Sequence, residues 1–451
     1  MLNKPVGNYS AGLGVFGMKG RKLIFRFFCF VVLASSILLL CSCSKEKEAG
    51  REKVRIRWYI WADPTMKLVY ERMVEAFKIE EPNIEVRLEA VPWTSYENKL
   101  LTMMVGNSTP DVFTAGRSML YLYTRKGGVL SIDNFVKADK DLNIEDFYKP
   151  AIEACQMDDK LYALPKELNV VCMFYNKTLF DRAGVSYPKD GWTWADFLKA
   201  AQKLTISENG RKTQAGYSVW RGSTGWLPWV WQNGGDLYDN WTRPGKTYLE
   251  KPEFQGALQF LVDLVYKYDV APTPAQEESM GGIWYAGRLG IMTSWINIFP
   301  GCLKQIKNFD WDVVPPPMNK KKATRGLVLL YAISSQTKHP EESYRFLKFL
   351  SGPEAQKIIA ESRIGIPARK SIAESTLFID PAKKPMNLKS IVDSIEYAEF
   401  DPGSELSNFS EINAVVDKHF DYIFLGKISV KEGCLNAKSR AEKMLSESRE
   451  R

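Results

Sequence analysis

The sequence predicts an α/β protein with two lobes, each a mostly parallel sheet flanked by helices. Strand and helix patterns alternate from residue 54 onward, and the same alternation returns from residue 170. Alternation of this kind is typical of strands joined by crossover helices. A chain of 451 residues has room for two such lobes. Because no long linker separates the two patterns, we expect several crossing segments to form a hinge.

The first half of the pattern begins with an apolar residue at every second position over 54–61, which indicates a strand. Apolar residues then recur at helical spacing, and Pro82-Asn83 marks a turn. Gly106 stops a second helix. The elements that we expect in this half are strands at 54–61, at 84–88 and from 110, and helices at 66–77 and 95–105.

The second half opens on a continuous apolar run at 170–175, which is typical of a strand buried on both faces. Thr193 and Asp196 have the spacing of a helix capping box. Glycine and proline interrupt the tryptophan-rich stretch around Trp226, which predicts a loop until about Leu227. The other elements expected here are helices from 194, at 252–268 and at 340–350, and a strand at 290–293.

Residues 1–42 have the layout of a secretory signal, with a basic start, an apolar run and a small-residue end. Leu40-Cys41-Ser42-Cys43 resembles the lipobox of bacterial lipoproteins, which implies cleavage before Cys43 and a lipid on its sulfur. The charged segment 43–53 is then a solvated tether. An ordinary signal or a short membrane anchor is the alternative. We expect an extracytoplasmic protein, held by its lipid at the cell surface or the periplasmic face of the membrane.

Composition excludes several partners. Five basic residues and no acid lie in 1–42, so subtracting them from the net charge of +8 leaves +3, and nothing indicates a nucleic-acid partner. Nucleotide cofactors are scarce outside the cytoplasm, and we expect no cofactor and no metal. No C-x-x-C pair occurs. An oxidising compartment would permit a disulfide, but we interpret four cysteines as buried free thiols: Cys155, Cys172, Cys302 and Cys434.

A series of short motifs, each weak alone, occurs in a characteristic order. The motifs are Trp61-Ala62-Asp63, Pro110-Asp111-Val112-Phe113, Tyr162-Ala163-Leu164-Pro165, Tyr175-Asn176-Lys177 with Phe180 and Ala183-Gly184, Trp192-Thr193-Trp194-Ala195-Asp196-Phe197, Trp231-Gln232-Asn233-Gly234-Gly235, Ala286-Gly287-Arg288-Leu289-Gly290-Ile291-Met292 with Ser294-Trp295, Ala332-Ile333-Ser334-Ser335, the helix from Pro340, and Gly365-Ile366-Pro367. From about residue 54 to 445 this order resembles the family 1 extracellular solute-binding proteins, the sugar-binding components of ABC importers. The glycine-rich segment usual before Ala-Ile-Ser is reduced here to Arg325-Gly326-Leu327.

The resemblance implies a periplasmic-binding-protein-like fold of type II, whose two lobes shut around a ligand by a hinge motion. It implies an N-terminal lobe of 54–164 plus 312–370 and a C-terminal lobe of 165–311 plus 371–451. The loaded protein would dock on ABC permease subunits in the membrane. We expect a monomer that catalyses nothing and whose ligand is a sugar or oligosaccharide.

Aromatic rings suit the C–H faces of a sugar, and four tryptophans are candidates to stack on it. Trp61 and Trp93 follow the first two strands, where ligands of such sheets bind, although either could instead brace its lobe. Trp226 is the candidate from the tryptophan-rich stretch, in which Trp229 or Trp231 is expected in the core. Trp295 corresponds to a position that commonly stacks on sugar in the family.

Polar candidates surround the same region. Asp63 follows the first strand and either contacts ligand or caps a helix before Pro64. Arg117 and Ser118 follow the third strand, near the first-lobe contact loop of the family, and arginine donates in a planar fork that suits two hydroxyls or a carboxylate. Asn169 lies where the chain passes into the later lobe. Arg325 is a further candidate for the cleft.

Three alternatives remain open at this level. A secreted glycoside hydrolase would use two acids, for which Asp63 and Asp236 are the candidates. The same fold could bind a phosphorylated or acidic sugar or another solute through a set of arginines that can pair with a negative group, namely Arg117, Arg221 and Arg325. A purely structural surface lipoprotein is the third alternative.

Overall fold

The computed structural model describes residues 53–400, 403–404, 406 and 408–449. The predicted signal peptide and the lipidation site Cys43 lie outside the described residues, and of the tether only Lys53 is described. Among the helices of the described part, none has the length and apolar character that crossing a membrane requires.

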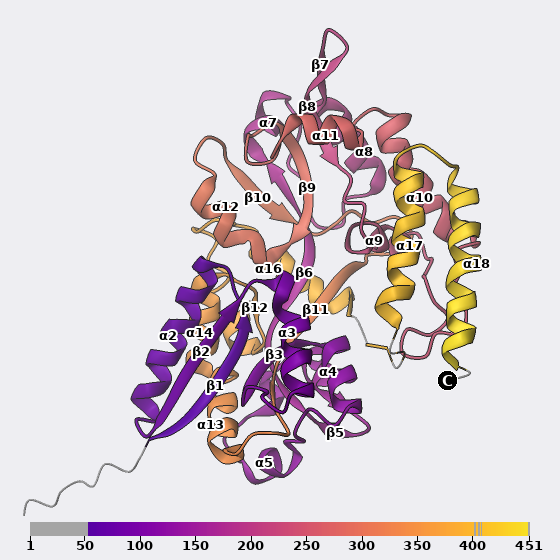
Figure 1. Cartoon of the computed structure of the whole chain (residues 1–451). Coiled ribbons are helices and arrows are strands. Elements are labelled where there is room, and N and C mark those ends of the chain that lie inside the picture. The colour runs from indigo at the N-terminus through magenta and orange to yellow at the C-terminus, as the bar shows by residue number, and fades with distance from the viewer. Residues whose placement is uncertain (1–52, 401–402, 405, 407, 450–451) are drawn as a thin grey trace, which may run out of the picture. The chain divides into compact units, whose positions relative to one another are not determined.

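A mixed sheet of eleven strands runs through both halves of the molecule, in the order β2-β1-β3-β11-β6-β9-β8-β7 (Figure 1). Three short strands join it at the side, since β10 and β12 pair with β6 and β13 pairs with β11. The strands are β1 (Val54–Trp61), β2 (Ile84–Val91), β3 (Val112–Gly116), β6 (Ala163–Asn176), β7 (Ile206–Glu208), β8 (Arg211–Ser218), β9 (Leu289–Trp295), β10 (Trp311–Val314), β11 (Thr324–Ile333), β12 (Ile366–Pro367) and β13 (Ala398–Phe400), with a separate pair of β4 (Gln156–Met157) and β5 (Lys160–Leu161).

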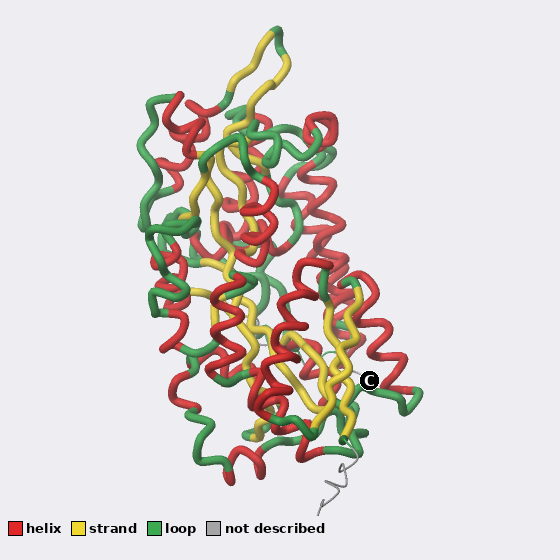
Figure 2. Tube along the Cα trace, turned by 90° about the vertical axis from the view of Figure 1, so that its left-hand side faces the viewer, coloured by secondary structure: helices red, strands yellow, loops and turns green. Residues whose placement is uncertain are grey.

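Helices pack on both faces of the sheet (Figure 2). We call the part around β1, β2 and β3 the first lobe and the part around β8 and β9 the second lobe. The α-helices are α2 (Pro64–Glu80), α3 (Trp93–Val105), α4 (Arg117–Arg125), α5 (Asp133–Ala138), α6 (Lys149–Cys155), α7 (Lys177–Arg182), α8 (Trp194–Leu204), α9 (Ser223–Gln232), α10 (Pro252–Tyr266), α11 (Pro274–Met280), α12 (Phe299–Gln305), α13 (Pro340–Leu350), α14 (Pro353–Ser362), α15 (Lys370–Ala373), α16 (Leu388–Asp393), α17 (Phe409–Phe424) and α18 (Val430–Arg449).

The long strand β6 links the two lobes. Its first part pairs with β11 and β12, and its second part pairs with β9 and β10. All fourteen of its residues are buried, as the apolar run at 170–175 predicts. Because β6 belongs to the pairing of both lobes and β11 lies beside it, these two strands are the main crossing segments.

The prediction of mostly parallel sheets needs correction. Parallel pairs join β1 to β2, β1 to β3 and β8 to β9, where crossover helices connect the strands. Antiparallel pairs join β11 to β3 and both β11 and β9 to β6. Apart from the short strand β13, which is parallel to β11, the neighbours of the crossing strands run in the opposite direction to them, so the sheet as a whole is mixed.

Local sequence signals set the helix starts. The Thr193 hydroxyl accepts from the backbone N–H of Asp196 at 3.2 Å, and the Asp196 carboxylate accepts from the backbone N–H of Thr193 at 3.0 Å. This is the capping box that the sequence predicts for α8. Proline occupies the first turn of α13, with Glu341 and Glu342 beside it, as predicted from the favourable interaction of acids with a helix N-terminus.

Two hydrophobic cores stabilise the molecule. One lies around β1, β3 and β11 and continues along β6 to Trp284, Phe299 and Trp311. The other lies in the second lobe among α8, α9, α10, α17 and α18 and contains Trp226 and Trp229. The four cysteines interpreted as buried free thiols are free and buried.

The stretch around Trp226 is a helix, which contradicts the predicted loop. α9 runs from Ser223 to Gln232 with Pro228 inside it, and every residue from Gly225 onward is buried. Pro228 is the sixth residue of the helix, so it has no N–H to donate to the carbonyl oxygen of Thr224 and it disfavours the helix at this point. Burial of the tryptophan rings outweighs the weak helix propensity of glycine and proline.

Candidate functional site

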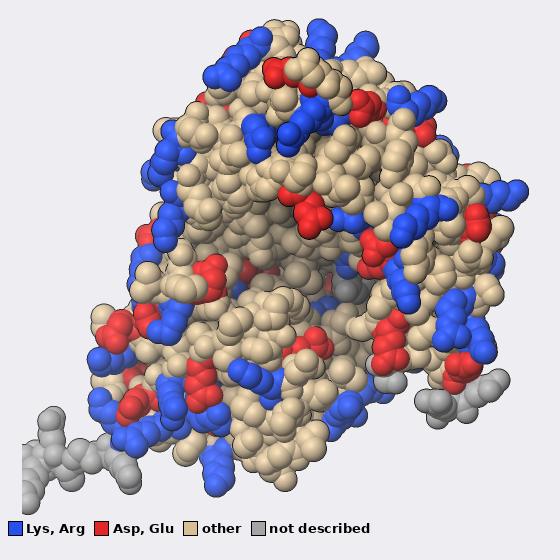
Figure 3. All heavy atoms as spheres, turned by 45° about the horizontal axis from the view of Figure 1, so that its top comes forward, with Lys and Arg blue, Asp and Glu red and all other residues tan. Residues whose placement is uncertain are grey.

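The surface of the molecule is hollowed between its upper and lower parts in the space-filling view (Figure 3). One hollow, of about 730 Å³, lies on the second lobe. It is formed by the segment after β8, the loop before β9 and β9 itself. Its lining includes Ser218, Trp220, Arg221, Gly222, Glu277, Trp284, Tyr285, Thr293 and Asp421.

A second hollow, of about 530 Å³, lies between the lobes. Asp63 and Met66 of the first lobe line one side of it, and Asn297 and Lys304 of the second lobe line the other. Tyr285 lines both hollows. We call the two hollows together the central groove. Each hollow by itself has a volume in the range of sites that bind small-molecule ligands.

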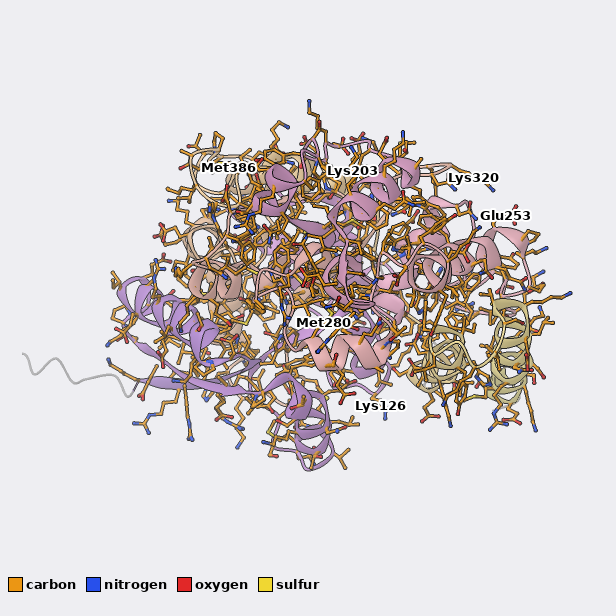
Figure 4. The ribbon with its side chains drawn as sticks, turned by 90° about the horizontal axis from the view of Figure 1, so that it is seen from above. Lys126, Lys203, Glu253, Met280, Lys320 and Met386 are labelled. Carbon is orange, nitrogen blue, oxygen red and sulfur yellow. The ribbon has the colours of Figure 1, made fainter. Side chains whose placement is uncertain are left out.

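The topology explains why these residues meet. β8 and β9 are parallel, so the residues that follow both strands lie at the same edge of the sheet. Trp220 follows β8 and Asn297 follows β9. In the first lobe, Asp63 follows β1 in the same way. Ligands of open α/β sheets bind beyond the carboxyl ends of the strands, which is where the groove lies. Met280, labelled in Figure 4, closes α11 just before the glycine loop that lines the larger hollow.

The central groove has a mixed set of charges and no excess of cations. Two cations and three carboxylates line it: Arg221, Lys304, Asp63, Glu277 and Asp421. The Ser218 hydroxyl donates to the Glu277 carboxylate. Burial, together with Cys302, raises the pKa of Tyr285 to about 12. Its phenol therefore stays protonated at neutral pH and can donate a hydrogen bond in the groove.

Trp61 and Trp93 lie together at the ends of β1 and β2. Their ring centroids are 4.8 Å apart in an edge-to-face arrangement, and Trp61 meets Tyr96 in the same way at 4.8 Å. Trp93 begins α3 and is 57% exposed. Trp61 is therefore braced by its neighbours, whereas Trp93 presents an open ring.

Asp63 caps a helix and also lies at the groove, so it fits both of the roles considered for it from the sequence. Its Oδ1 accepts from the backbone N–H groups of Thr65 at 2.7 Å and Met66 at 2.8 Å, which caps α2. The residue is exposed and lines the central groove. The cap is a structural role, and it also fixes the carboxylate at the groove wall.

Trp295 ends β9 at the junction of the two hollows. Its backbone pairs with Val171 of β6, and its side chain is half-buried. Thr293, two residues earlier, lines the larger hollow, and Asn297, two residues later, lines the smaller one. Trp295 itself lines neither hollow.

The remaining polar candidates do not line the central groove. Arg117 begins α4 and donates from Nη1 to the carbonyl oxygens of Ala154, at 2.8 Å, and Gln156. Ser118 is its half-buried neighbour. Two backbone carbonyls therefore hold the guanidinium that the sequence assigns to a ligand.

Asn169 and Arg325 lie on the crossing strands. Asn169 is buried in β6 and donates from Nδ2 to Glu167 Oε1 at 3.3 Å, while no donor among the described residues reaches its buried Oδ1. Arg325 of β11 donates to the hydroxyls of Ser223 at 3.3 Å and Thr224 at 3.4 Å. It lines a separate small cavity.

The prediction that Trp226 lies in a loop and stacks on ligand is corrected by its burial. The side chain is fully buried in the second-lobe core, edge-to-face with Phe254 and Phe420. Its indole N–H donates to Asp417 at 3.1 Å. Trp229 and Trp231 are buried as well, as expected for at least one of them.

Trp220 is the groove residue that the prediction missed in this stretch. It follows β8, and the rule that singled out Trp61 after β1 would have selected it. β8 itself was not predicted, because Arg211–Ser218 is mostly polar and carries no clear apolar alternation. The tyrosine at 285 has no comparable signal, since it lies in a loop between glycines.

Solved structures share this fold. An ABC substrate-binding protein from Listeria monocytogenes, solved in complex with cycloalternan, matches with a TM-score of 0.78 and 27% identity over 87% of this chain and 99% of that chain. A maltose-bound MalE3 of T. maritima matches with a TM-score of 0.72 and 19% identity over 87% of this chain and 100% of that one. The fold is therefore that of the two-lobed periplasmic binding proteins of type II.

The comparison of sequences gives the family. Residues 63–357 match the family model described as bacterial extracellular solute-binding protein, and the chain belongs to that family. A putative binding protein of Brucella abortus is 23% identical over 87% of this chain and 92% of its own length. The maltotriose-binding protein of Pyrococcus abyssi is 26% identical over 70% of this chain and 66% of its own length. The resemblance stated from the motifs is confirmed.

Proposed function

We propose that this chain binds a sugar or oligosaccharide in the central groove and delivers it unchanged to an ABC permease. One observation carries the proposal: the groove lies beyond the strand ends, has walls from both lobes and is lined by the tryptophans Trp220 and Trp284. Relatives and structural neighbours include a maltotriose-binding protein and proteins solved with cycloalternan or mannotriose. These ligands are consistent with a groove of this kind.

Three rings that line neither hollow are proposed to stack on the sugar when the lobes close: Trp61, Trp93 and Trp295. Asp63 is proposed to accept from sugar hydroxyls at the groove wall. Arg117, Ser118, Asn169 and Arg325 lie outside the groove as it stands, so we propose that they reach ligand only when the lobes close. The buried Oδ1 of Asn169, which lacks a donor among the described residues, supports its part in this proposal because buried acceptors without partners are costly.

The charges of the groove favour an uncharged solute. A phosphorylated or acidic sugar would require a clear excess of donors such as arginine. The groove has three carboxylates against two cations. Of the three arginines considered from the sequence, only Arg221 lines it. A neutral carbohydrate fits this balance better than an anionic one.

The positions of Asp63 and Asp236, the two acids considered for hydrolysis, do not favour a glycoside hydrolase. The Asp63 carboxylate caps α2. Asp236 accepts through Oδ1 from two indole N–H groups, and it lines a different cavity. A glycoside hydrolase needs two carboxyl groups facing one bond. We therefore propose a binding protein without catalytic activity.

The proposal includes a hinge motion and a place in the cell. The lobes, taken as 54–164 plus 312–370 and 165–311 plus 371–451, would close around the ligand by bending of the crossing segments. A lipid on Cys43 would keep the monomer at the membrane, near its permease.

A thermal-shift and calorimetry screen over neutral mono- and oligosaccharides tests the proposal. A ligand present at about 100 times its dissociation constant should raise stability by about 2.7 kcal/mol. Trp93→Ala should then weaken binding by about two- to tenfold, because one aromatic contact adds roughly 0.5–1.5 kcal/mol. Its 57% exposure makes loss of folding an unsuitable explanation.

Tyr422→Ala is the matched control, since it removes an exposed ring on α17 outside the groove. It should leave the affinity unchanged. If no neutral sugar raises the melting temperature while an anionic solute does, the proposed ligand is wrong. Release of reducing ends during incubation would overturn the absence of catalysis.

A further inference from the structure

The chain enters the fold at an edge of the first lobe that lies at the other end of the strands from the groove. β1, β2 and β3 are parallel, so their amino ends lie together there. α2 and α3 run back between these strands and end at the same edge (Figure 1). β11 is antiparallel to β3 and also ends there. We call the surface formed by Val54 and residues 78–83, 105–110 and 334–339 the entry edge.

Two apolar side chains project from the entry edge. Ile79 is 84% exposed and Val105 is 82% exposed, which makes them the most exposed large apolar side chains of the described residues. Ile79 lies in the last turn of α2 and Val105 in the last turn of α3. Burial against a nonpolar phase would stabilise both.

The two side chains lie on opposite faces of the sheet. β2 and β3 flank β1 on its two sides, so the crossovers that contain α2 and α3 run in opposite directions across the sheet. Right-handed crossovers then place the two helices on opposite faces. A partner that covers both Ile79 and Val105 must therefore be broad enough to extend across the end of the sheet.

Hydrogen bonds fix the turns of the entry edge. The backbone N–H of Val54 donates to the carbonyl oxygen of Asn83 at 3.1 Å. Gln336 donates from Nε2 to the carbonyl oxygen of Met104 at 2.9 Å and accepts at Oε1 from the Thr109 hydroxyl at 2.9 Å. The segments that carry the two apolar side chains are therefore held in place.

The charges at the entry edge nearly cancel. Arg55 pairs with Glu85 at 3.0 Å, and Arg345 pairs with Glu81 at 3.6 Å. Three further lysines stand against three glutamates at or beside the edge: Lys53, Lys126, Lys338, Glu80, Glu341 and Glu342. Lysine can extend its ammonium group to water while its stem lies along an apolar surface. Apolar contact, rather than net charge, therefore decides what this edge binds.

The predicted lipid selects the surface that the edge can meet. Lys53 is ten residues after Cys43, and a chain of that length spans at most about 36 Å. A lipid on Cys43 would thus hold the entry edge within that distance of the bilayer. Such a tether makes the contact intramolecular, at an effective concentration of about millimolar, so two side chains are enough to populate it.

We propose that the entry edge is a membrane-contact surface, at which Ile79 and Val105 enter the interfacial region of the lipid bilayer. The inference rests on the lipid anchor proposed at Cys43 and is independent of the ligand's identity. A bilayer is broad enough to meet both side chains at once. Because the groove lies at the other ends of the strands, this contact leaves it open to solute.

Fluorescent labels at single introduced cysteines test the contact. The lipidated protein would be reconstituted in phosphatidylcholine vesicles with or without doxyl-labelled lipid, and Ile79→Cys or Val105→Cys would carry the fluorophore. The four cysteines of the described residues are buried and should stay unlabelled. We expect the doxyl lipid to quench both labels several-fold.

Leu68→Cys is the matched control for position. Leu68 is 63% exposed on the same helix, α2, but lies eleven residues nearer the groove, which is about 17 Å along the helix axis. Its label should not be quenched. Quenching equal to that at Ile79 would mean that α2 lies along the membrane, and it would overturn the contact at the entry edge.

A label at Asn83→Cys tests the two apolar side chains without replacing either one. Adding Ile79→Ser and Val105→Ser should lower the equilibrium constant for contact by about tenfold or more, because burial of one aliphatic side chain is worth about that factor. Leu68→Ser with Leu435→Ser is the matched pair, since it removes two exposed apolar side chains away from the edge. That pair should leave the quenching at Asn83→Cys unchanged.

The other outcomes also decide the proposal. Absence of quenching at Ile79→Cys and Val105→Cys overturns it. Labels shielded from aqueous iodide but not quenched by doxyl lipid would mean that another protein covers the edge, which overturns it as well. Neither result affects sugar binding, which calorimetry measures separately. A mass spectrum of the purified protein without a lipid overturns the anchor and the contact together.

Discussion

The tryptophans of residues 220–231 divide between core and groove, although the sequence presents them as one cluster. Trp226, Trp229 and Trp231 are buried, whereas Trp220 lines the larger hollow. The difference arises because α9 begins at Ser223. Residues inside that helix are directed by its packing against α10 and α17, while Trp220 stays on the segment that leaves β8.

Trp226→Ala should therefore act on stability. Truncating a fully buried aromatic ring costs about 3–5 kcal/mol, and the change also removes the donor to the buried Asp417. Urea unfolding should show a loss of this size. Trp93→Ala, in contrast, should cost less than about 1 kcal/mol because its ring is mostly exposed. A small effect of Trp226→Ala would contradict its placement in the core.

The environment of Asp146 predicts that the free energy of unfolding falls in acid. Burial alone would raise the pKa of its carboxyl, but hydrogen bonds outweigh this and hold the pKa below its usual range. The donors are Ser371 N at 3.0 Å, Ser371 Oγ at 2.8 Å and the buried Arg369 at 3.2 Å. A depressed pKa gives stability that is present above the unfolded value of about 3.9 and lost as pH falls through the folded value.

The comparison of the unmodified protein with Asp146→Asn checks this expectation. The difference in unfolding free energy should be constant above about pH 5 and shrink below about pH 4. Urea denaturation at several pH values would measure it. A difference that stays constant into strong acid would show that the charge of Asp146 plays no part.

At the scale of elements, α8 lies against β8 at very close range. An added Cβ at Gly216 would lie 2.0 Å from the carbonyl oxygen of Ala201, far inside any allowed contact. The glycine therefore lets the helix approach the strand and helps to set the edge from which Trp220 and Arg221 extend into the groove.

Gly216→Ala should destabilise the protein by about 3 kcal/mol or more, since backbone must move to relieve the clash. Gly301→Ala in α12 is the matched control, because an added Cβ there meets only side-chain atoms at 3.7 Å and beyond. Helix propensity predicts a neutral or slightly stabilising effect at that position. Equal melting temperatures for the two variants would contradict the close packing of α8 on β8.

Elements with a clean pattern were predictable, and polar ones were not. β1 and α2 follow from the spacing of apolar residues, and the capping box of α8 follows from two residues. β8 was missed because its first half is polar and pairs with the exposed strand β7, so its sequence lacks the alternation that burial of one face imposes. Because β8 was not predicted, the groove residues that follow it were not predicted either.

At the scale of the whole molecule, the crossing strands join two bodies with a groove between them. If ligand binding closes the lobes, the radius of gyration in solution should fall when a bound sugar saturates the protein. Small-angle X-ray scattering with and without that sugar measures the change. Binding with an unchanged radius of gyration would show that the lobes do not move.

The sequence by itself determined the α/β class, the family, the capping signals and most of the strands and helices. These depend on periodicity and on the order of short motifs, which are local properties of the chain. Only the tertiary structure decided that the sheet is mixed, that Trp226 is core, and that Tyr285 and Trp220 line the groove. Those features depend on which segments, distant in sequence, pack together, and packing between β6, β9, β11 and α9 is a property that no local pattern records.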